Sequence, residues 1–274
     1  MQQELLVVGL LIPQEKDLLL LLQMHLFLVT GRFPFLITVS TIFIGCYFTG
    51  VLSSVVSTLA VVLVILLGIF LTLMISRILS KTLLKGEASS FILELPPYRK
   101  PQIGKVLIRS LLDRTLFVLA RAVSVAAPIG IVIWLFANIS FGGASILSYI
   151  AYFLDPFARL LGLDGYILTA FILGIPANEI VLPTLLMSYL ATSSLVDLSD
   201  TFAIKEILLS HGWNLLTGIN VMIFTLLHFP CSTTLITVYK ETKSLKWTLL
   251  SFALPTMCGI VICLITTGVW NLVM

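Results

Sequence analysis

The 274-residue chain is 59% hydrophobic and 11% charged, against about 25% charged residues in an ordinary soluble domain. This composition excludes a soluble enzyme or binding module and predicts an integral membrane protein. The net charge of +3 is too small to indicate a nucleic-acid partner. The first fifteen residues lack a basic region and a small-residue cleavage site, so no cleavable signal peptide is expected. The cysteines lie in or beside apolar segments, where free thiols are expected rather than disulfides: Cys46, Cys231, Cys258 and Cys263.

Three apolar runs without a charged side chain predict continuous membrane helices: Phe33–Ser76, Ala122–Leu154 and Trp247–Met274. About 20 residues span a bilayer, so the first run accommodates two helices. A turn between them is expected from Gly45 to Gly50. With one of the interrupted runs described next, the chain is predicted to be an all-α, polytopic membrane protein with about five spanning helices.

Three breaks interrupt the other apolar runs. Tyr166–Leu190 is broken between Pro176 and Pro183, and Trp213–Tyr239 is broken at His228-Phe229-Pro230-Cys231-Ser232-Thr233-Thr234. A third break, Thr30-Gly31-Arg32-Phe33-Pro34, follows a run that is too short to span. Proline interrupts a helix and leaves carbonyl groups without partners, which is tolerated at membrane depth only beside protein or a water-filled cavity. Broken helices of this kind commonly build the ion sites of transporters.

The positions of basic residues predict which segments face the cytoplasm. Nine of the sixteen Lys and Arg residues lie between Arg77 and Arg121, and three more precede the last apolar run: Lys240, Lys243 and Lys246. Cytoplasmic loops carry such an excess of basic residues. We therefore predict that both segments are cytoplasmic and that residues 80–112 form an interfacial elbow with an amphipathic helix.

The number of membrane crossings then constrains the two long interrupted runs. The helix that ends near Asn138 exits on the outside and the Lys240 cluster is inside, so one interrupted run crosses and the other turns back. Trp213–Pro230 would be about 27 Å long as a helix, enough to span nearly alone. Tyr166–Leu190 is therefore predicted to be a re-entrant hairpin entered from outside, with Glu179 near its tip. The opposite assignment stays open, because acidic loop residues orient a membrane protein poorly.

The interrupted segments are also where the chain resembles a known family. Three motifs in the same order are similar to the membrane region of the ferrous-iron transporter family FeoB: Phe91-Ile92-Leu93-Glu94-Leu95-Pro96-Pro97-Tyr98-Arg99, Pro176-Ala177-Asn178-Glu179-Ile180-Val181-Leu182-Pro183 and His228-Phe229-Pro230-Cys231-Ser232-Thr233-Thr234. The tail Lys240–Trp247 is similar too, and the resemblance runs from about Asp17 to the C-terminus. It implies the second half of the FeoB permease, including a second "Gate" element in which Pro230-Cys231 lines the iron path.

The resemblance also implies a cargo, a location and partners. Fe(II) would be the transported substrate, in a multi-pass protein of the bacterial inner membrane. Partners would be the lipid bilayer, further copies of the chain, small accessory Feo proteins, and a polypeptide that supplies the GTPase and the first Gate. No nucleic acid is implied.

Two departures from the family pattern shape the expected organisation. The chain has no Gly-x-x-x-x-Gly-Lys-Ser/Thr loop to cradle phosphates, and the first Gate motif, of the Gly-Cys-Asn-Val-Pro type, is missing. We therefore expect no GTP site and no enzymatic activity in this chain, which resembles half of a split or truncated transporter. The predicted division is 1–79 for N-terminal membrane helices (a partial first half), 80–112 for the elbow and 113–274 for the FeoB-type C-terminal Gate or permease region.

Glu179 is the first candidate cation ligand, because it is the only acidic side chain within Tyr166–Leu190. An ionisable group at membrane depth normally faces a cavity or a partner, and marks ion pathways. Its alternative role is a buried carboxylate that caps the half-helix after the break. Asn178 is a candidate ligand or, in preference, a cap of the same half-helix. Pro176 and Pro183 are expected to act through geometry alone.

Cys231 follows Pro230 at the second break and is the second main candidate, since a thiol suits Fe(II) and a helix N-terminus favours the thiolate. Its alternative role is packing as a small buried residue. His228 could ligate Fe(II) through its imidazole, although a structural role is preferred. Thr233, with Thr234, is expected to cap the half-helix, with hydroxyl ligation secondary. The remaining His, Met and Cys side chains considered are expected at interfaces or in packing: His25, His211, Met187, Met222, Cys258 and Cys263.

Two other functions stay open from the sequence. One is a Gate-type permease for another divalent metal or for a nucleoside. The other is a membrane scaffold or truncated remnant that transports nothing, which the missing first half favours.

Overall fold

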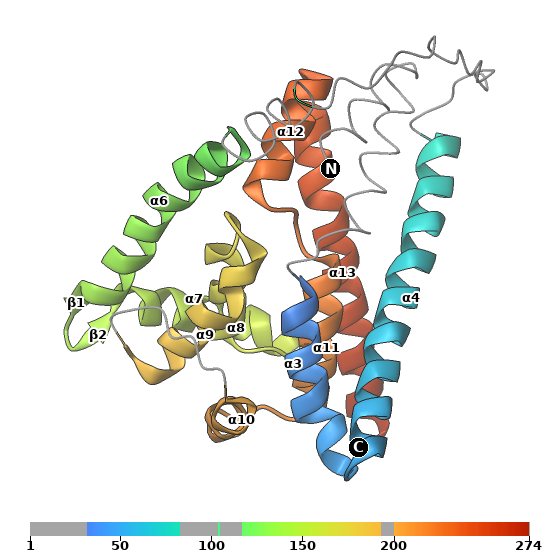
Figure 1. Cartoon of the computed structure of the whole chain (residues 1–274), viewed down its shortest axis with the longest axis vertical. Helices are drawn as coiled ribbons and strands as arrows, with labels where there is room; N and C mark the ends of the chain where they lie inside the picture. The colour runs from blue at the N-terminus through green and yellow to red at the C-terminus, as the bar shows by residue number, and fades with distance from the viewer. Residues whose placement is uncertain (1–31, 83–103, 105–116, 193–199, 274) are drawn as a thin grey trace.

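The computed structural model describes residues 32–82, 104, 117–192 and 200–273, and these residues are predominantly helical (Figure 1). The all-α fold class is confirmed, since the strands of the described residues are a single two-residue pair joined in antiparallel register. The elements are α3 (Phe33–Phe43), η2 (Gly45–Tyr47), α4 (Val51–Thr82), α6 (Phe117–Asn138), β1 (Ser140–Phe141), β2 (Ala144–Ser145), α7 (Ile146–Leu160), α8 (Gly165–Leu173), η4 (Asn178–Ile180), α9 (Val181–Leu190), α10 (Thr201–Ser210), α11 (Leu215–Leu227), α12 (Ser232–Thr242) and α13 (Leu245–Val273).

Three helical stretches are long and apolar enough to cross a membrane: Val51–Ile78, Leu215–Lys240 and Leu245–Val273. The count rises to four if α7 and α8, which are bent by 110°, form one span. The sequence predicted about five. The number is lower among the described residues because the first apolar helix ends with η2 at Tyr47 and the apolar part of α6 covers only Ala127–Asn138. The predicted turn between Gly45 and Gly50 is present, since α4 begins at Val51.

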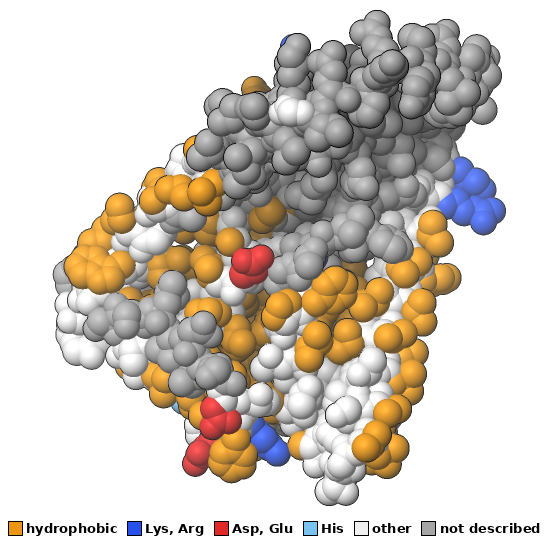
Figure 2. All heavy atoms as spheres, in the orientation of Figure 1, with side chains coloured by type: hydrophobic (Ala, Val, Ile, Leu, Met, Phe, Trp, Pro, Cys, Tyr) orange, Lys and Arg blue, Asp and Glu red, His pale blue; other side chains and the backbone are white. Residues whose placement is uncertain are grey.

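Basic residues gather at one end of the molecule. The C-terminal ends of α4 and α12 and the start of α13 lie together at the top of Figure 1, opposite the α3–α4 turn, α10 and the C-terminus. Arg77 and Lys81 belong to the first of these ends, and Lys240 and Lys246 to the others. Hydrophobic side chains cover the outer edge of α4, and Lys or Arg side chains stand at its upper end (Figure 2). This is the pattern of a lipid-facing helix whose basic end is cytoplasmic. The predicted elbow, 80–112, lies outside the described residues except for residues 80–82, which end α4, and Gly104.

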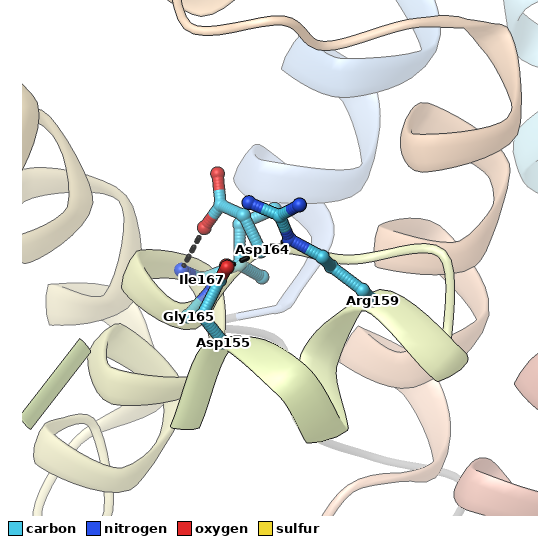
Figure 3. Close-up of polar contacts among 5 residues, drawn as sticks. All are labelled: Asp155, Arg159, Asp164, Gly165 and Ile167. Carbon is cyan, nitrogen blue, oxygen red and sulfur yellow. Dashed lines mark hydrogen bonds and ion pairs between the residues drawn. The ribbon is translucent and has the colours of Figure 1, made fainter. Parts of the chain in front are cut away.

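Polar contacts hold the corner between α7 and α8, where the two helices are bent by 110° (Figure 3). Asp164 caps α8, because its Oδ1 accepts a hydrogen bond of 2.7 Å from the Ile167 amide. Asp155 accepts from the Gly165 amide at 3.2 Å and pairs with Arg159 at 2.7 Å. Residue 165 has to be glycine here, since a Cβ atom would lie 1.9 Å from the Ala151 carbonyl oxygen. The two helices therefore approach with backbone against backbone.

The segment Tyr166–Leu190 forms an antiparallel hairpin of α8 and α9. The Tyr189 hydroxyl, in the last turn of α9, donates a hydrogen bond to the Asp164 carboxylate at the start of α8. Trp213 Nε1 donates to the Tyr189 oxygen at 2.8 Å. The far ends of the hairpin are thus joined at its base, and the break lies at its tip. The hairpin and the position of its break are as predicted, while its re-entrant character stays a prediction. The stretch Leu215–Lys240, made of α11 and α12, is long and apolar enough to cross a membrane.

The core that holds the hairpin is aromatic. The Phe171 ring of α8 lies 6.3 Å from Phe35 of α3, 5.0 Å from Phe224 of α11 and 4.9 Å from the His228 ring. Phe171 is almost completely buried. Burial of an aromatic side chain of this size is worth about 2–3 kcal/mol, so these contacts fix the hairpin against the end of α11.

The two predicted proline breaks differ in where their prolines lie. Pro176 and Pro230 are in non-helical backbone, between α8 and η4 and between α11 and α12. Pro183 was predicted to end the first break, but it lies inside the first turn of α9. Proline is tolerated there because the first amides of a helix have no helical acceptor. The break itself is Gly174–Ala177 followed by the single turn of η4.

Candidate cation site

The two broken segments meet at their breaks. The Ser232 amide, at the start of α12, donates a hydrogen bond of 2.8 Å to the Ile175 carbonyl in the hairpin tip. The His228 imidazole Nε2 lies 3.2 Å from Asn178 Oδ1. Residues that are 50 or more positions apart in the chain are therefore brought together where both helices are interrupted. This meeting point is the candidate cation site.

The hydrogen bonds of His228 orient its ring. Nδ1 lies 3.1 Å from the Phe224 carbonyl and 2.8 Å from the Thr225 carbonyl. A carbonyl only accepts, so Nδ1 carries the proton and donates. In the neutral ring, Nε2 then presents its lone pair toward Asn178, with the amide nitrogen of Asn178 as the donor that suits it. A main-chain acceptor on one ring nitrogen is the usual support for a histidine that binds a metal through the other.

Contrary to the preferred prediction, Asn178 does not cap the half-helix. The residue before α9 is Ile180, and no side chain caps α9 or η4. Asn178 instead turns inward, is 6% exposed and faces His228. Its other amide atom is buried without a hydrogen-bond partner among the described residues: Nδ2 in the recorded orientation, and Oδ1 once the amide is turned so that Nδ2 donates to His228. A buried amide with one free polar atom is costly, which fits a position that takes a ligand better than one that only packs.

Glu179 lies at the hairpin tip, as predicted, but not buried. Its side chain is exposed and, in the part of the chain that the structure describes, makes no hydrogen bond or ion pair. The alternative role as a buried cap is therefore wrong. No hydrogen bond joins it to Cys231. The short turn of η4 sends Asn178 inward and Glu179 outward, so the two neighbouring side chains do not share the meeting point.

Cys231 is the residue that precedes α12, and it is partly buried. Its sulfur lies 3.0 Å from the Thr233 hydroxyl and 3.1 Å from the Thr234 hydroxyl. The two hydroxyls thus bind the thiol, and no side chain caps α12, contrary to the expected capping by Thr233 and Thr234. Next to them, the Ser232 hydroxyl is buried without a partner among the described residues. Sulfur and hydroxyl groups are consequently gathered at the N-terminal end of α12.

The secondary candidates lie away from this point. Met187, Met222 and Cys263 are buried in packing, as predicted. His211 is exposed and stacks on Tyr189 at 4.2 Å, and His25 lies outside the described residues. Among the described residues, no group of three or more His, Cys, Asp and Glu side chains could hold a metal ion. A cation at the meeting point would therefore need amide, hydroxyl or carbonyl oxygen atoms in addition to the His228 and Cys231 side chains.

Arg32 is a residue of this site that sequence reasoning missed. It precedes α3 and is 4% exposed. Its guanidinium donates to the carbonyls of Leu226, Phe229 (3.3 Å) and His228 (3.5 Å), at the C-terminal end of α11. In the sequence, Arg32 is a lone basic residue between Gly31 and a helix start that contains proline. The sequence pattern predicted only a break in this segment.

Two family models match this chain, one of them over the candidate cation site. Residues 61–113 match the model described as "Ferrous iron transport protein B C terminus". Residues 119–245, which contain both breaks of the site, match a model named Gate and described as "Nucleoside recognition".

Curated relatives agree with these models. The chain is 28% identical over 198 residues to the Fe(2+) transporter FeoB of Staphylococcus aureus (strain COL), covering 70% of this chain and 28% of that protein. It belongs to the FeoB family, in its C-terminal membrane region. The Fe(2+) transporter FeoB of Synechocystis sp. is 30% identical over 174 residues, or 60% of this chain and 26% of the relative. The Leptospira interrogans FeoB is 26% identical over 216 residues, covering 70% and 30%.

The chain thus spans less than a third of the length of the family members it matches. No solved structure matches it. Family membership and the apolar helices together make the chain a membrane protein of the Fe(2+) transporter family. The division into segments 1–79, 80–112 and 113–274 stays a prediction.

Proposed function

We propose that this chain forms the C-terminal part of an Fe(II) importer of the bacterial inner membrane, and that the cation passes where the two broken segments meet. The observation that carries the proposal is the contact of the two breaks, with the Ser232 amide on the Ile175 carbonyl at 2.8 Å and His228 beside Asn178 at 3.2 Å. Two interrupted helices meeting inside an apolar protein are how many transporters present backbone and side-chain ligands to an ion.

The arrangement supplies ligands in an order that suits weak, stepwise binding. The exposed Glu179 carboxylate attracts a hydrated cation to the hairpin tip. The inward groups then offer the His228 Nε2 lone pair, the Asn178 amide oxygen when the amide is turned toward a cation, and the sulfur of Cys231 with the hydroxyl of Thr233. Nitrogen and sulfur ligands suit Fe(II), a cation of intermediate softness. A site with few strong ligands binds weakly enough to release its ion, which conduction requires.

The proposal leaves GTP hydrolysis to another polypeptide or to a part outside this sequence. This chain would not itself be an enzyme, and Fe(II) would be its substrate rather than a resident cofactor. A GTPase with the first Gate, small accessory Feo proteins and further copies of the chain are the proposed partners.

Iron uptake in cells tests this assignment. The variants Glu179→Gln and Cys231→Ser are expressed in cells that lack their own iron importers and supply the GTPase and first Gate. Each is expected to lower the uptake of radioactive Fe(II) about tenfold or more, since each removes a ligand or attracting group from the path. The matched controls Glu206→Gln and Cys46→Ser make the same changes at exposed positions away from the breaks, and their uptake should equal that of the unchanged chain. Full uptake by both site variants would refute the assigned path.

A second candidate function is transport of another solute, favoured by the description "Nucleoside recognition" of the matched Gate model. The same cells distinguish it. Uptake of zinc or a nucleoside that does not compete with iron would support this candidate. A folded, membrane-inserted chain with no uptake of any of them would favour the scaffold or remnant.

A further inference from the structure

The buried Arg32 occupies a position that a cation would favour. Its guanidinium contacts the carbonyls of Leu226, His228 and Phe229. These carbonyls belong to the last turn of α11 and to the break that follows. They receive no hydrogen bond from a helical amide, because the chain stops being helical at His228. The C-terminal end of a helix also carries a partial negative charge. The three oxygen atoms, which we name the carbonyl cage, therefore attract positive charge.

The described residues pair the polar atoms and the charge of Arg32 only in part. No carboxylate of the described residues forms an ion pair with Arg32, and its Nε atom is buried without a hydrogen-bond partner there. A buried guanidinium without a counter-ion is costly at membrane depth. Hydrogen bonds from a carbonyl cage offset only part of that cost. The carbonyl hydrogen bonds therefore hold Arg32 in place, while its uncompensated charge leaves the guanidinium open to displacement.

The carbonyl cage adjoins the candidate cation site. His228 contributes its carbonyl to the cage and its ring to the contact with Asn178. A divalent cation bound by the His228 ring would lie near the guanidinium, which contacts the carbonyl of the same residue, and like charges repel strongly in an apolar interior. Occupation by the cation and engagement of Arg32 are consequently antagonistic.

We propose that Arg32 is an internal plug. Its guanidinium fills the carbonyl cage in place of a divalent cation, and the cage becomes part of the cation site when the start of α3 withdraws. Half-helix C-terminal ends and unwound carbonyls are groups that coordinate cations in transporters, and here they are occupied by a side chain of the protein itself. The inference rests on the proposed cation path and adds to it a regulating residue.

The connection of Arg32 to α3 makes the plug a means of coupling. Arg32 is the residue before α3, and α3 packs on α11 through the buried core that includes Phe35 and Phe224. A shift of α3 along α11 would withdraw the guanidinium without unfolding either helix. Such a shift would couple the position of α3 to the end of α11, 194 residues further along the chain from Arg32.

Binding of Mn(II) to the purified full chain in detergent tests the plug without any need for transport. Free Mn(II) is measured by electron paramagnetic resonance in a titration. Arg32→Gln removes the charge from the cage and is expected to bind Mn(II) about tenfold more tightly than the unchanged chain, as typical coupling between antagonistic ligands predicts. Arg159→Gln removes one positive charge from a side chain of α7 that is 76% exposed and should leave the affinity unchanged.

A second variant guards against loss of folding, which is monitored by size-exclusion chromatography and thermal unfolding. Arg32→Lys keeps the charge, but its single nitrogen cannot reach both the Leu226 and the Phe229 carbonyls as the two guanidinium nitrogens do. It should bind Mn(II) more tightly than the unchanged chain and more weakly than a folded Arg32→Gln. The tighter binding of either folded variant supports the plug.

Equal or weaker binding by the folded variants, or no binding by any form, would overturn the plug and leave Arg32 as a structural cap of α11. The proposed function is judged separately, by the iron uptake of Glu179→Gln and Cys231→Ser. Loss of uptake in those variants with unchanged Mn(II) binding in the Arg32 variants would reject the plug alone.

Discussion

Two buried asparagines differ in how completely their amides are paired. Asn220 donates to the Leu161 carbonyl at 2.8 Å and to the Thr267 hydroxyl at 2.9 Å, and its oxygen accepts from Thr266. Every polar atom of that amide is thus paired. Asn178 is also buried but keeps one amide atom without a partner among the described residues. Fully paired amides tie helices together, while a half-paired amide is open to a further ligand.

At the residue scale, Tyr189→Phe tests the base of the hairpin. The change removes the hydroxyl that donates to Asp164 and accepts from Trp213, and leaves the carboxylate and the indole N–H without that partner. The free energy of unfolding should fall by about 1–3 kcal/mol, measured as a lower apparent melting temperature of the purified protein. Tyr152→Phe removes a hydroxyl from a side chain that is 83% exposed and should melt like the unchanged protein. Equal melting temperatures of the two variants would show that the hydrogen bonds at the base of the hairpin contribute nothing to stability.

At the scale of elements, the site depends on two half-helices being presented to each other end-on. The α7–α8 corner turns the chain by 110°, and the aromatic core around Phe171 holds α8 against α11. The tip of the hairpin then reaches the break between α11 and α12, where the Ser232 amide finds the Ile175 carbonyl. Each break thereby satisfies part of the other's backbone, as irregular backbone at membrane depth requires.

Gly165→Ala tests the corner that positions the hairpin. The added Cβ would lie 1.9 Å from the Ala151 carbonyl oxygen and 2.8 Å from its carbon, so α7 and α8 must separate. Overpacking of this kind costs about 1–3 kcal/mol or more, and the hairpin tip should shift with α8. We expect a lower melting temperature and reduced iron uptake. Gly130→Ala is the matched control, because nothing lies within 4 Å of its added Cβ in α6. An unchanged melting temperature in Gly165→Ala would contradict the close approach.

At the scale of the whole molecule, basic residues and the re-entrant hairpin define opposite ends. The end that carries Lys240 and Lys246 is predicted to be cytoplasmic, and the α3–α4 turn and the base of the hairpin lie toward the other end (Figure 1). This orientation predicts that the hairpin is entered from outside, with its tip at the break between α11 and α12. A cation that enters past the hairpin would leave toward the basic end.

Labelling of thiols in intact cells tests this orientation. Cys46 is an exposed thiol of the α3–α4 turn, so a membrane-impermeant maleimide should modify it from outside, and Cys46→Ser should lose that label. Lys243→Cys, made in the Cys46→Ser chain, should be labelled only after the membrane is permeabilised, because it follows α12 at the basic end. The reverse pattern would invert the topology and place the hairpin entrance in the cytoplasm.

Much of the fold could be predicted because its signals are local. Proline and glycine interrupt a helix through their own backbone geometry, so the breaks at Pro176 and Pro230 and the turn before Val51 were predictable from neighbouring residues. Pro183 was assigned wrongly for the same local reason, since proline both ends helices and fits their first turn. The number of spanning helices was less predictable, because a long apolar run does not show where a short helix such as α3 stops.

The sequence alone determined that this is an all-α membrane protein with two interrupted segments, with Glu179 at one break and Cys231 at the other, since composition, proline positions and charge bias act residue by residue. Tertiary structure decided which side chains face each other. The rotation of one short turn turns Asn178 inward and Glu179 outward, and the packing of α3 on α11 brings Arg32 to carbonyls nearly two hundred residues away. Neither result follows from local propensity, because direction and distance between half-helices are set by how their buried faces pack.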